Sequence, residues 1–190
     1  MVPEKTDPES LRREKQLLRR EIREAAASLP EDYRREAGKR IAEQVLALEA
    51  YRKARVVMAY VSLPGEPDTS LILEDACAAG KTVLLPRCVS PERMEALPFT
   101  GPDGMETGRL GIPEPRTPAE GKDIPEPELI LVPCVTVSPD GRRLGHGAGY
   151  YDRFLAERKA ETVCLCFRRL MREDIPAGPR DRRMDRVVTD

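Results

Sequence analysis

Apolar residues in the first fifty positions recur at the spacing of amphipathic helices. From residue 8 to residue 29 they return at intervals of three, four or seven, as Leu11, Leu18, Ile22, Ala25 and Leu29. Asp7 followed by Pro8 is typical of an N-cap and a first-turn proline. A second helical segment begins near Pro30 and fades by Ala54. We therefore expect two helices, paired as a helical hairpin over about residues 8–53, that lead into a sheet.

The pattern changes after residue 54 to short runs that are apolar throughout. These runs, rich in β-branched residues, are 56–61, 82–85, 129–132 and 162–167. Continuous apolar runs of this length are typical of strands buried on both faces of a parallel sheet. Between the first two runs, Asp68, Thr69 and Ser70 form a helix start and Gly80 forms a helix stop. This arrangement predicts a strand–helix–strand crossover.

Weaker signals complete the predicted domain. Residues 94–99 alternate in polarity, which indicates an edge strand, and residues 186–189 add a last short strand. The proline-rich stretch 101–127 is expected to be a long surface loop. With 190 residues and no internal repeat, the chain predicts a single domain, 1–190. The expected fold is α/β, a three-layer sandwich with a mostly parallel central sheet and an α/β core at about 55–190.

The composition of the chain excludes several classes of protein. Lys and Arg number 32 and Asp and Glu number 33, which gives a formal net charge of −1 and disfavours a general polyanion-binding surface. No stretch is apolar for the length of a membrane span, and the N-terminal segment lacks the layout of a secretory signal. The five cysteines include no Cys-x-x-Cys pair, and the single histidine is His146. We therefore expect a cytoplasmic protein with reduced thiols, in which oxygen ligands hold any metal, as for Mg²⁺ or Ca²⁺.

The segment with the most specific chemistry is 140–153. Its three glycines at alternate positions, Gly145, Gly147 and Gly149, free the backbone to lie against a ligand, and their N–H groups can form an anion-binding nest. The alternative is a glycine-rich turn that only reverses the chain. The spacing matches neither a P-loop nor the dinucleotide fingerprint. The segment thus predicts a phosphate site of another kind.

The residues around the glycines support phosphate binding. A helix is expected to begin directly after them and to continue to Lys159, and a helix N-terminus favours phosphate. Arg142 and Arg143 add positive charge at the rim of the nest. Asp152 lies in the first turn of this helix. Its carboxylate either complements the helix dipole or holds Mg²⁺ against the phosphates, and the local sequence does not separate these two roles.

Other polar residues have weaker claims to function. Glu66 lies in the loop after the first predicted strand, at the edge where open α/β sheets bind ligands. Asp181 and Asp185 are either further carboxylates for a metal or part of a solvated charge run. His146 has no identifiable serine or cysteine partner, so a catalytic triad is not expected.

The glycine segment and several shorter ones give the chain a resemblance to a known family. The specific part is residues 143–153, which read Arg-Leu-Gly-x-Gly-x-Gly-Tyr-Tyr-Asp-Arg. The shorter matches come in family order over nearly the whole chain, at residues 15–19, 62–69, 85–87, 111–115, 132–133, 181 and 187–190. On these segments the chain resembles the 5-formyltetrahydrofolate cyclo-ligases, also called 5,10-methenyltetrahydrofolate synthetases.

The resemblance implies a fold like that of the sugar-phosphate isomerase and CoA-transferase group. It implies conversion of 5-formyltetrahydrofolate to 5,10-methenyltetrahydrofolate with ATP and Mg²⁺, through phosphoryl activation of the formyl oxygen and with release of ADP and phosphate. By position, the catalytic residues would be Arg143 and Lys15, and the metal ligands Asp152 and Asp181. The ATP-binding residues would be Lys15, Arg19, Arg143, Leu144, Gly145, His146, Gly147, Ala148, Gly149, Tyr150 and Tyr151. The substrate-binding residues would be Glu66, His146, Gly147, Ala148, Gly149 and Tyr150.

Two other hypotheses stay open on the sequence. His146 and Arg169 depart from the residues usual in the family, which would permit a paralogue of the same fold that activates another formyl or amide compound. The bases of the first helix would permit a nucleotide- or RNA-binding module without turnover, although glutamates alternate with them as on an ordinary solvated helix. The partners we expect are small molecules, ATP and a reduced formyl folate, with no nucleic acid and no membrane, bound by a monomer.

Overall fold

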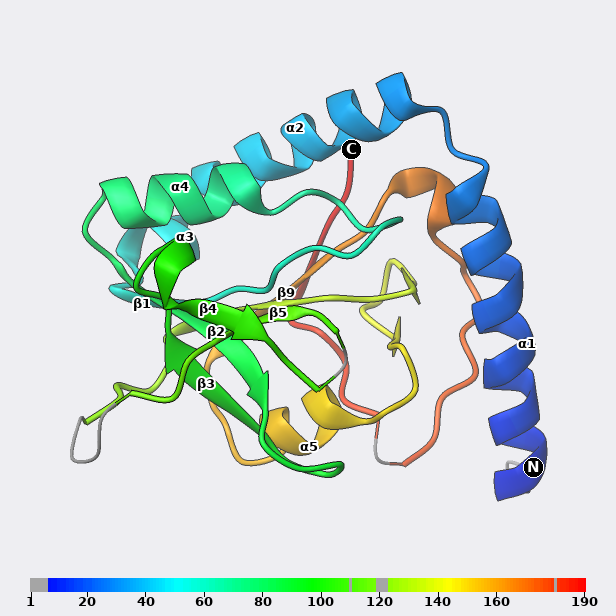
Figure 1. Ribbon diagram of the computed structural model, residues 1–190. Helices are drawn as coiled ribbons and strands as arrows, with labels where there is room; N and C mark the ends of the chain where they lie inside the picture. The colour runs from blue at the N-terminus through cyan, green and yellow to red at the C-terminus, as the bar shows by residue number, and fades with distance from the viewer. Residues whose placement is uncertain (1–6, 110, 119–122, 180) are drawn as a thin grey trace.

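A computed structural model of the chain describes residues 7–109, 111–118, 123–179 and 181–190, and its centre is a six-stranded sheet. The strand order is β10-β9-β6-β1-β2-β3 (Figure 1). The strands are β1 (Val56–Met58), β2 (Thr82–Cys88), β3 (Met94–Pro98), β6 (Leu129–Val132), β9 (Glu161–Leu165) and β10 (Arg186–Val188). Neighbouring strands are parallel except at the edge, where β3 is antiparallel to β2. The mostly parallel sheet that the apolar runs predict is confirmed. The edge strand expected at 94–99 is also present, as β3, and the structure shows that it is antiparallel.

Helices cover both faces of this sheet. They are α1 (Pro8–Ala27), α2 (Glu31–Ala47), α3 (Glu49–Lys53), α4 (Ser70–Ala78) and α5 (Tyr150–Leu155), with two short 3₁₀ turns, η1 (Pro102–Gly104) and η2 (Arg168–Leu170). In Figure 1, α2 and α4 lie together above the sheet and α5 lies below it, which gives the three expected layers. The predicted crossover helix is α4, and the carboxylate of Asp68 accepts a hydrogen bond from the Ser70 N–H at its start (2.9 Å). No helix in the described ranges is long and apolar enough to span a membrane.

The two N-terminal helices are present as predicted, but they do not pair along their lengths as a hairpin would. The Asp7 carboxylate accepts a hydrogen bond from the Ser10 N–H at 3.1 Å, so α1 has the expected N-cap. α2 packs on α4, whereas α1 diverges from α2 and stands beside the loops that follow β1 and β6 (Figure 1). The apolar stripe of α1 packs on η2 and on the loop after β1, where Ala26 meets Gly65. This packing places α1 at the carboxyl edge of the sheet.

Other predicted boundaries differ from the structure. β1 ends at Met58, because Tyr60 and Val61 leave the sheet to line a cavity. The stretch 101–127, expected to be a loop, contains a two-stranded hairpin of β4 (Met105–Thr107) and β5 (Pro113–Pro115). Arg87 holds this hairpin against β2, since its guanidinium donates to the Pro115 carbonyl oxygen at 2.7 Å.

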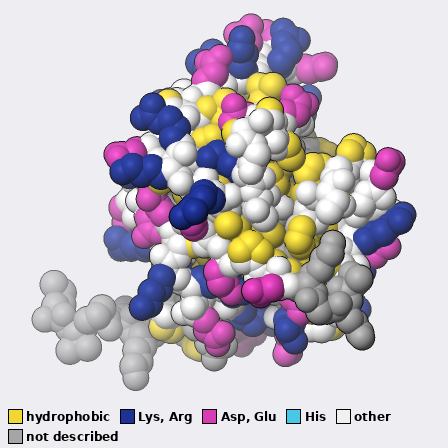
Figure 2. All heavy atoms as spheres, turned by 90° about the vertical axis from the view of Figure 1, so that its left-hand side faces the viewer, with side chains coloured by type: hydrophobic (Ala, Val, Ile, Leu, Met, Phe, Trp, Pro, Cys, Tyr) yellow, Lys and Arg dark blue, Asp and Glu magenta, His cyan; other side chains and the backbone are white. Residues whose placement is uncertain are grey.

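Charged side chains of both signs are mixed on one face of the molecule. On the face shown in Figure 2, Lys and Arg side chains are interspersed with Asp and Glu, and hydrophobic side chains gather near the middle. This arrangement matches the near-zero net charge of the chain. It differs from the single-sign stripe that marks an electrostatic footprint for nucleic acid.

A second small hairpin leads into the glycine segment. It consists of β7 (Thr136–Val137) and β8 (Arg143–Leu144), joined by a turn in which the Gly141 N–H donates to the Ser138 carbonyl oxygen at 2.9 Å. Gly141 has φ +83°, and a Cβ at this position would lie 2.4 Å from the carbonyl oxygen of Met184. The turn therefore requires glycine for two independent reasons, conformation and close approach.

We expect Gly141→Ala to reduce the free energy of unfolding by about 2 kcal/mol or more, as measured by urea denaturation. Gly80→Ala is the matched control. Gly80 also has a positive φ (+70°), but a Cβ there would meet no atom within 4 Å, so only the conformational strain of about 1–2 kcal/mol applies. Equal losses of unfolding free energy in the two variants would contradict the expected clash between the added Cβ and the Met184 carbonyl oxygen.

Candidate active site

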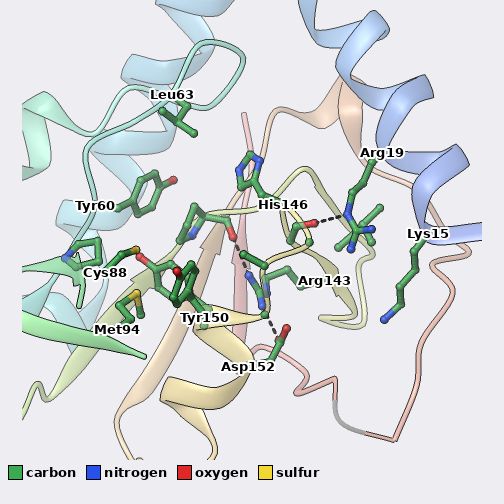
Figure 3. Close-up of a pocket in the computed structure, with 18 of the residues that line it drawn as sticks. Lys15, Arg19, Tyr60, Leu63, Cys88, Met94, Arg143, His146, Tyr150 and Asp152 are labelled. Atoms are coloured by element: carbon green, nitrogen blue, oxygen red, sulfur yellow. Dashed lines mark hydrogen bonds and ion pairs between the residues drawn. The ribbon is translucent and has the colours of Figure 1, made fainter. Parts of the chain in front are cut away.

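A cavity of about 1010 Å³ opens at the carboxyl edge of the sheet. Its walls are one face of α1, the loop after β1, the glycine loop (residues 145–149) and an apolar wall. The apolar wall, as the term is used below, consists of Leu63, Pro86, Cys88, Met94, Ile112 and Tyr150. In Figure 3, Lys15 and Arg19 reach in from α1 on one side, and Tyr60, Cys88, Met94 and Tyr150 lie on the other. The cavity thus has a cationic side and an apolar side, with the glycine loop between them.

The glycine loop has the open backbone that the sequence predicts. Gly147 and Gly149 have φ values of +111° and +70°, whereas Gly145 does not have a positive φ. A Cβ on Gly147 would lie 3.4 Å from the guanidinium carbon of Arg19, so this glycine permits a close approach of α1. The helix that follows, α5, begins at Tyr150 as expected but ends at Leu155 rather than Lys159. Because a helix of six residues has a small dipole, the N–H groups of the loop would contribute more to binding an anion than the helix itself would.

Of the two arginines that precede the glycine loop, Arg143 is the one that lines the cavity. It is 8% exposed; its guanidinium donates to the Asp152 carboxylate at 2.6 Å and to the Pro133 carbonyl oxygen at 3.1 Å. Its Nε is buried without a hydrogen-bond partner among the described residues. Arg142, which the sequence also placed at the rim, turns away and pairs with Asp140 at 3.1 Å. The prediction for Arg142 is therefore wrong, because this residue belongs to the turn before β8, where its side chain is held by Asp140.

The cationic side of the cavity comes mainly from α1. Lys15 forms an ion pair with Asp181 (2.5 Å), and the Arg19 Nε–H donates to the carbonyl oxygen of Gly145 at 2.7 Å. Burial, together with the neighbouring charge of Arg23, lowers the pKa of Arg19 from its usual value. The loss of solvation and the crowding of cations favour binding of an anion here.

Glu66 and His146 meet inside the cavity. The Nε2 of His146 lies 2.8 Å from one oxygen of the Glu66 carboxylate, and the Leu63 N–H donates to the other oxygen at 2.8 Å. The side chain of Glu66 is 4% exposed, and that of His146 is 40% exposed. The structure thus brings together two predicted residues that are eighty positions apart in the sequence.

The two C-terminal aspartates have different environments. Asp181 lines the cavity, as the resemblance implies. Asp185 instead accepts hydrogen bonds from the Thr162 N–H at 2.9 Å and from the Thr162 hydroxyl at 2.6 Å, so it ties the C-terminal segment to β9. Of the two, only Asp181 is placed where it could meet a ligand.

Several lining residues were not predicted from the sequence. Tyr60 and Met94 were read only as parts of strands, and Cys88 was read as a thiol without a role. Burial and the charge of Glu114 raise the pKa of Cys88 to about 11, so this thiol is a neutral wall group. Their positions at strand ends are the only signal that the sequence offered, since such positions face the binding edge of an open sheet.

The donor set of the cavity fits a metal that is bound together with phosphate. No group of three or more His, Cys, Asp or Glu residues in the described ranges is arranged to hold a metal ion by itself. Asp152 and Asp181 both line the cavity, and each gives one oxygen to a cation, Arg143 and Lys15 respectively. The second oxygen of each carboxylate takes no part in these ion pairs and could bind a metal ion. Mg²⁺ is commonly held by one or two carboxylates, with phosphate oxygens and waters as the other ligands.

The fold and this cavity are typical of an α/β enzyme that acts on small molecules. The sequence model of the 5-formyltetrahydrofolate cyclo-ligase family matches residues 11–190. The chain belongs to this family, and it is therefore a ligase of folate one-carbon metabolism.

Individual relatives agree with this assignment. The chain is 31% identical to a 5-formyltetrahydrofolate cyclo-ligase of Mycolicibacterium smegmatis. The alignment spans 184 residues and covers 93% of this chain and 94% of that protein. It is 27% identical to the mouse 5-formyltetrahydrofolate cyclo-ligase, and this alignment covers 90% of this chain and 91% of the mouse protein. The structure of Aquifex aeolicus 5,10-methenyltetrahydrofolate synthetase is similar, with a TM-score of 0.79, 27% identity, and coverage of 92% of this chain and 88% of that one.

Proposed function

We propose that this chain converts 5-formyltetrahydrofolate to 5,10-methenyltetrahydrofolate with consumption of ATP and release of ADP and phosphate. The observation that carries the proposal is the two-sided cavity, in which the buried carboxylate of Glu66 and the apolar wall lie across the glycine loop from a cluster of cations. The family membership supplies the reaction class. We also propose that the chain acts as a monomer.

The cationic side of the cavity suits the triphosphate of ATP. Lys15 and Arg19 would approach the phosphates from α1, and Arg143 would approach them from β8. The backbone N–H groups of the glycine loop would complete the contacts. Phosphoryl transfer requires mainly positioning and neutralisation of charge, and lysine, arginine and N–H groups supply both.

Asp152, with Asp181 as the second ligand, would hold Mg²⁺ together with phosphate oxygens. When bound, the metal would neutralise charge on the phosphates. Arg143 holds one oxygen of Asp152, which fixes the direction of the other. This arrangement orients the carboxylate before any ligand enters.

The apolar side suits the pterin ring and the aryl group of the folate. Glu66 would accept hydrogen bonds from the ring, and it is already held in place by the Leu63 N–H and by His146. Tyr150 and Met94 would contact the flat ring from the apolar wall. The formyl group would then lie near the glycine loop, beside the phosphates.

The chemistry follows from this placement. The formyl oxygen is a poor leaving group and must first be activated. It attacks the γ-phosphorus of ATP, and ADP leaves. The lone pair of N10 attacks the activated formyl carbon, N10 loses its proton, and the C–O bond breaks with departure of phosphate. The side chains of Lys15 and Arg143 would stabilise the charge that develops on the phosphoryl oxygens. Because no protein nucleophile takes part, the lack of a catalytic triad is consistent with this route.

The test is a direct assay of the purified chain with 5-formyltetrahydrofolate and Mg-ATP, followed by the absorbance of the methenyl product. We expect ATP-dependent formation of product with one ADP released for each product molecule. Absence of turnover, together with no thermal shift from the folate, would refute the proposal. A ligand at about 100 times its dissociation constant adds roughly 2.7 kcal/mol of stability, which is easily detected.

Glu66→Ala separates the two sides of the cavity. We expect the KM for 5-formyltetrahydrofolate to rise about a hundredfold, because a buried hydrogen-bonding carboxylate is lost, while the KM for ATP stays within about twofold. Steady-state kinetics with each substrate varied in turn measures both values. Equal losses for the two substrates would contradict the assignment of Glu66 to the pterin ring.

A further inference from the structure

The hydroxyl group of Tyr60 is buried beside the cavity and has no partner. Tyr60 is 3% exposed, and no group among the described residues lies within hydrogen-bonding distance of its hydroxyl oxygen. The ring is part of the cavity lining, and in Figure 3 its hydroxyl points toward the space occupied by His146. Buried polar groups nearly always have partners, so an orphaned donor in a cavity wall calls for an explanation.

This hydroxyl shares its surroundings with the Glu66 carboxylate. Burial raises the pKa of Tyr60 well above its usual value, and the charge of Glu66 raises it further, so the hydroxyl keeps its proton and can donate. The two oxygens of Glu66 each take part in one hydrogen bond, with the Leu63 N–H and with His146. A carboxylate has about four lone-pair positions, so acceptor capacity remains. A donor and an acceptor with unused capacity therefore line the same cavity.

We propose that Tyr60 and Glu66 together recognise the lactam edge of the substrate's ring. The tyrosine hydroxyl donates to the ring carbonyl oxygen, and the carboxylate accepts from the adjacent ring N–H. The inference rests on the proposed function, in which the substrate is a formyl folate whose pterin ring carries a carbonyl group beside an N–H. Tyr60 is then a substrate-binding residue that selects a 4-oxo ring over a 4-amino ring, because an amino group at this position has no oxygen to accept the hydrogen bond.

Tyr51 provides a matched control in the same chain. It is 2% exposed, and its hydroxyl donates to the Asp75 carboxylate at 2.6 Å, away from the residues that line the cavity. Tyr51→Phe removes a satisfied hydroxyl, whereas Tyr60→Phe removes an unsatisfied one. Each substitution removes one phenolic hydroxyl group. A difference between the two variants therefore reflects whether that hydroxyl group has a hydrogen-bond partner.

We expect the two variants to change stability in opposite directions. Tyr60→Phe should raise the Tm by about 2–4 °C, since an uncompensated buried donor is lost, and Tyr51→Phe should lower it. In kinetics, Tyr60→Phe should raise the KM for 5-formyltetrahydrofolate about tenfold, leave the KM for ATP within about twofold, and change kcat little. Tyr51→Phe should leave all three kinetic values near those of the wild type. A gain in stability with a loss of substrate affinity is not expected of a residue that only packs.

Competitive inhibition by folic acid and by 4-amino-4-deoxyfolic acid, which differ at ring position 4 and in the proton on the adjacent ring nitrogen, tests the selectivity. The wild type should bind the 4-oxo compound more tightly, and Tyr60→Phe should reduce this preference about tenfold. An unchanged preference, an unchanged folate KM, or a Tm that falls as in Tyr51→Phe would each overturn the inference. A wild-type chain without turnover would instead overturn the proposed function, so the two failures are distinguishable.

Discussion

Replacing Arg143 by alanine is expected to reduce kcat/KM for methenyl product formation about a thousandfold, mostly through kcat. Its guanidinium is buried, it holds Asp152 in place, and its Nε is unpartnered at the position proposed for the phosphates. The substitution would remove a cation from the developing charge and would also leave Asp152 without its partner. Product absorbance at saturating and limiting ATP measures kcat and kcat/KM separately.

The neighbouring residue supplies the control for this prediction. Arg142→Ala removes the same charge one position away, but Arg142 pairs with Asp140 outside the cavity lining. We expect it to keep activity within about threefold of the wild type, because exposed ion pairs contribute little. Similar losses in both variants would mean that net charge near the loop, and not the placement of Arg143, determines the rate.

The features that follow from local pattern were predictable from the sequence. Apolar runs such as 129–132 identify buried strands without any knowledge of the fold, and residues 129–132 are all fully buried in the centre of the sheet. The glycine loop and the adjacent Asp152 could be placed in the cavity because loops after parallel strands meet at one edge of the sheet. The Glu66–His146 contact is a consequence of the same rule.

The features that depend on tertiary packing were not predictable. The divergence of α1 from α2 depends on what each helix meets, and helical periodicity gives the apolar face but not its partner. Which of Arg142 and Arg143 points inward depends on the register of β8, and a shift of one residue reverses the choice. Tyr60 lies in an apolar run that reads as strand, so its missing hydrogen bond is visible only once its neighbours are known.

Asp152→Asn is expected to raise the Mg²⁺ concentration required for half-maximal activity about a hundredfold, because a charged metal ligand is lost. The fold should stay intact. The asparagine carbonyl can still accept the hydrogen bond that Arg143 now donates to the carboxylate at 2.6 Å, so the orientation of Arg143 is retained while one negative charge is lost. The substitution therefore separates a role of Asp152 in binding Mg²⁺ from a role in orienting Arg143.

Activity titrated with Mg²⁺ at fixed ATP measures the effect, and Asp181→Asn is the companion variant. Asp181 accepts hydrogen bonds from Lys15 and the Gly178 N–H through the same oxygen, and an amide oxygen can replace both bonds. If Asp181 is the weaker ligand, its variant should shift the Mg²⁺ requirement less than Asp152→Asn does. An unchanged Mg²⁺ requirement in Asp152→Asn, with reduced kcat, would show that Asp152 serves only to orient Arg143, and the metal would then have to be held by the phosphates and water.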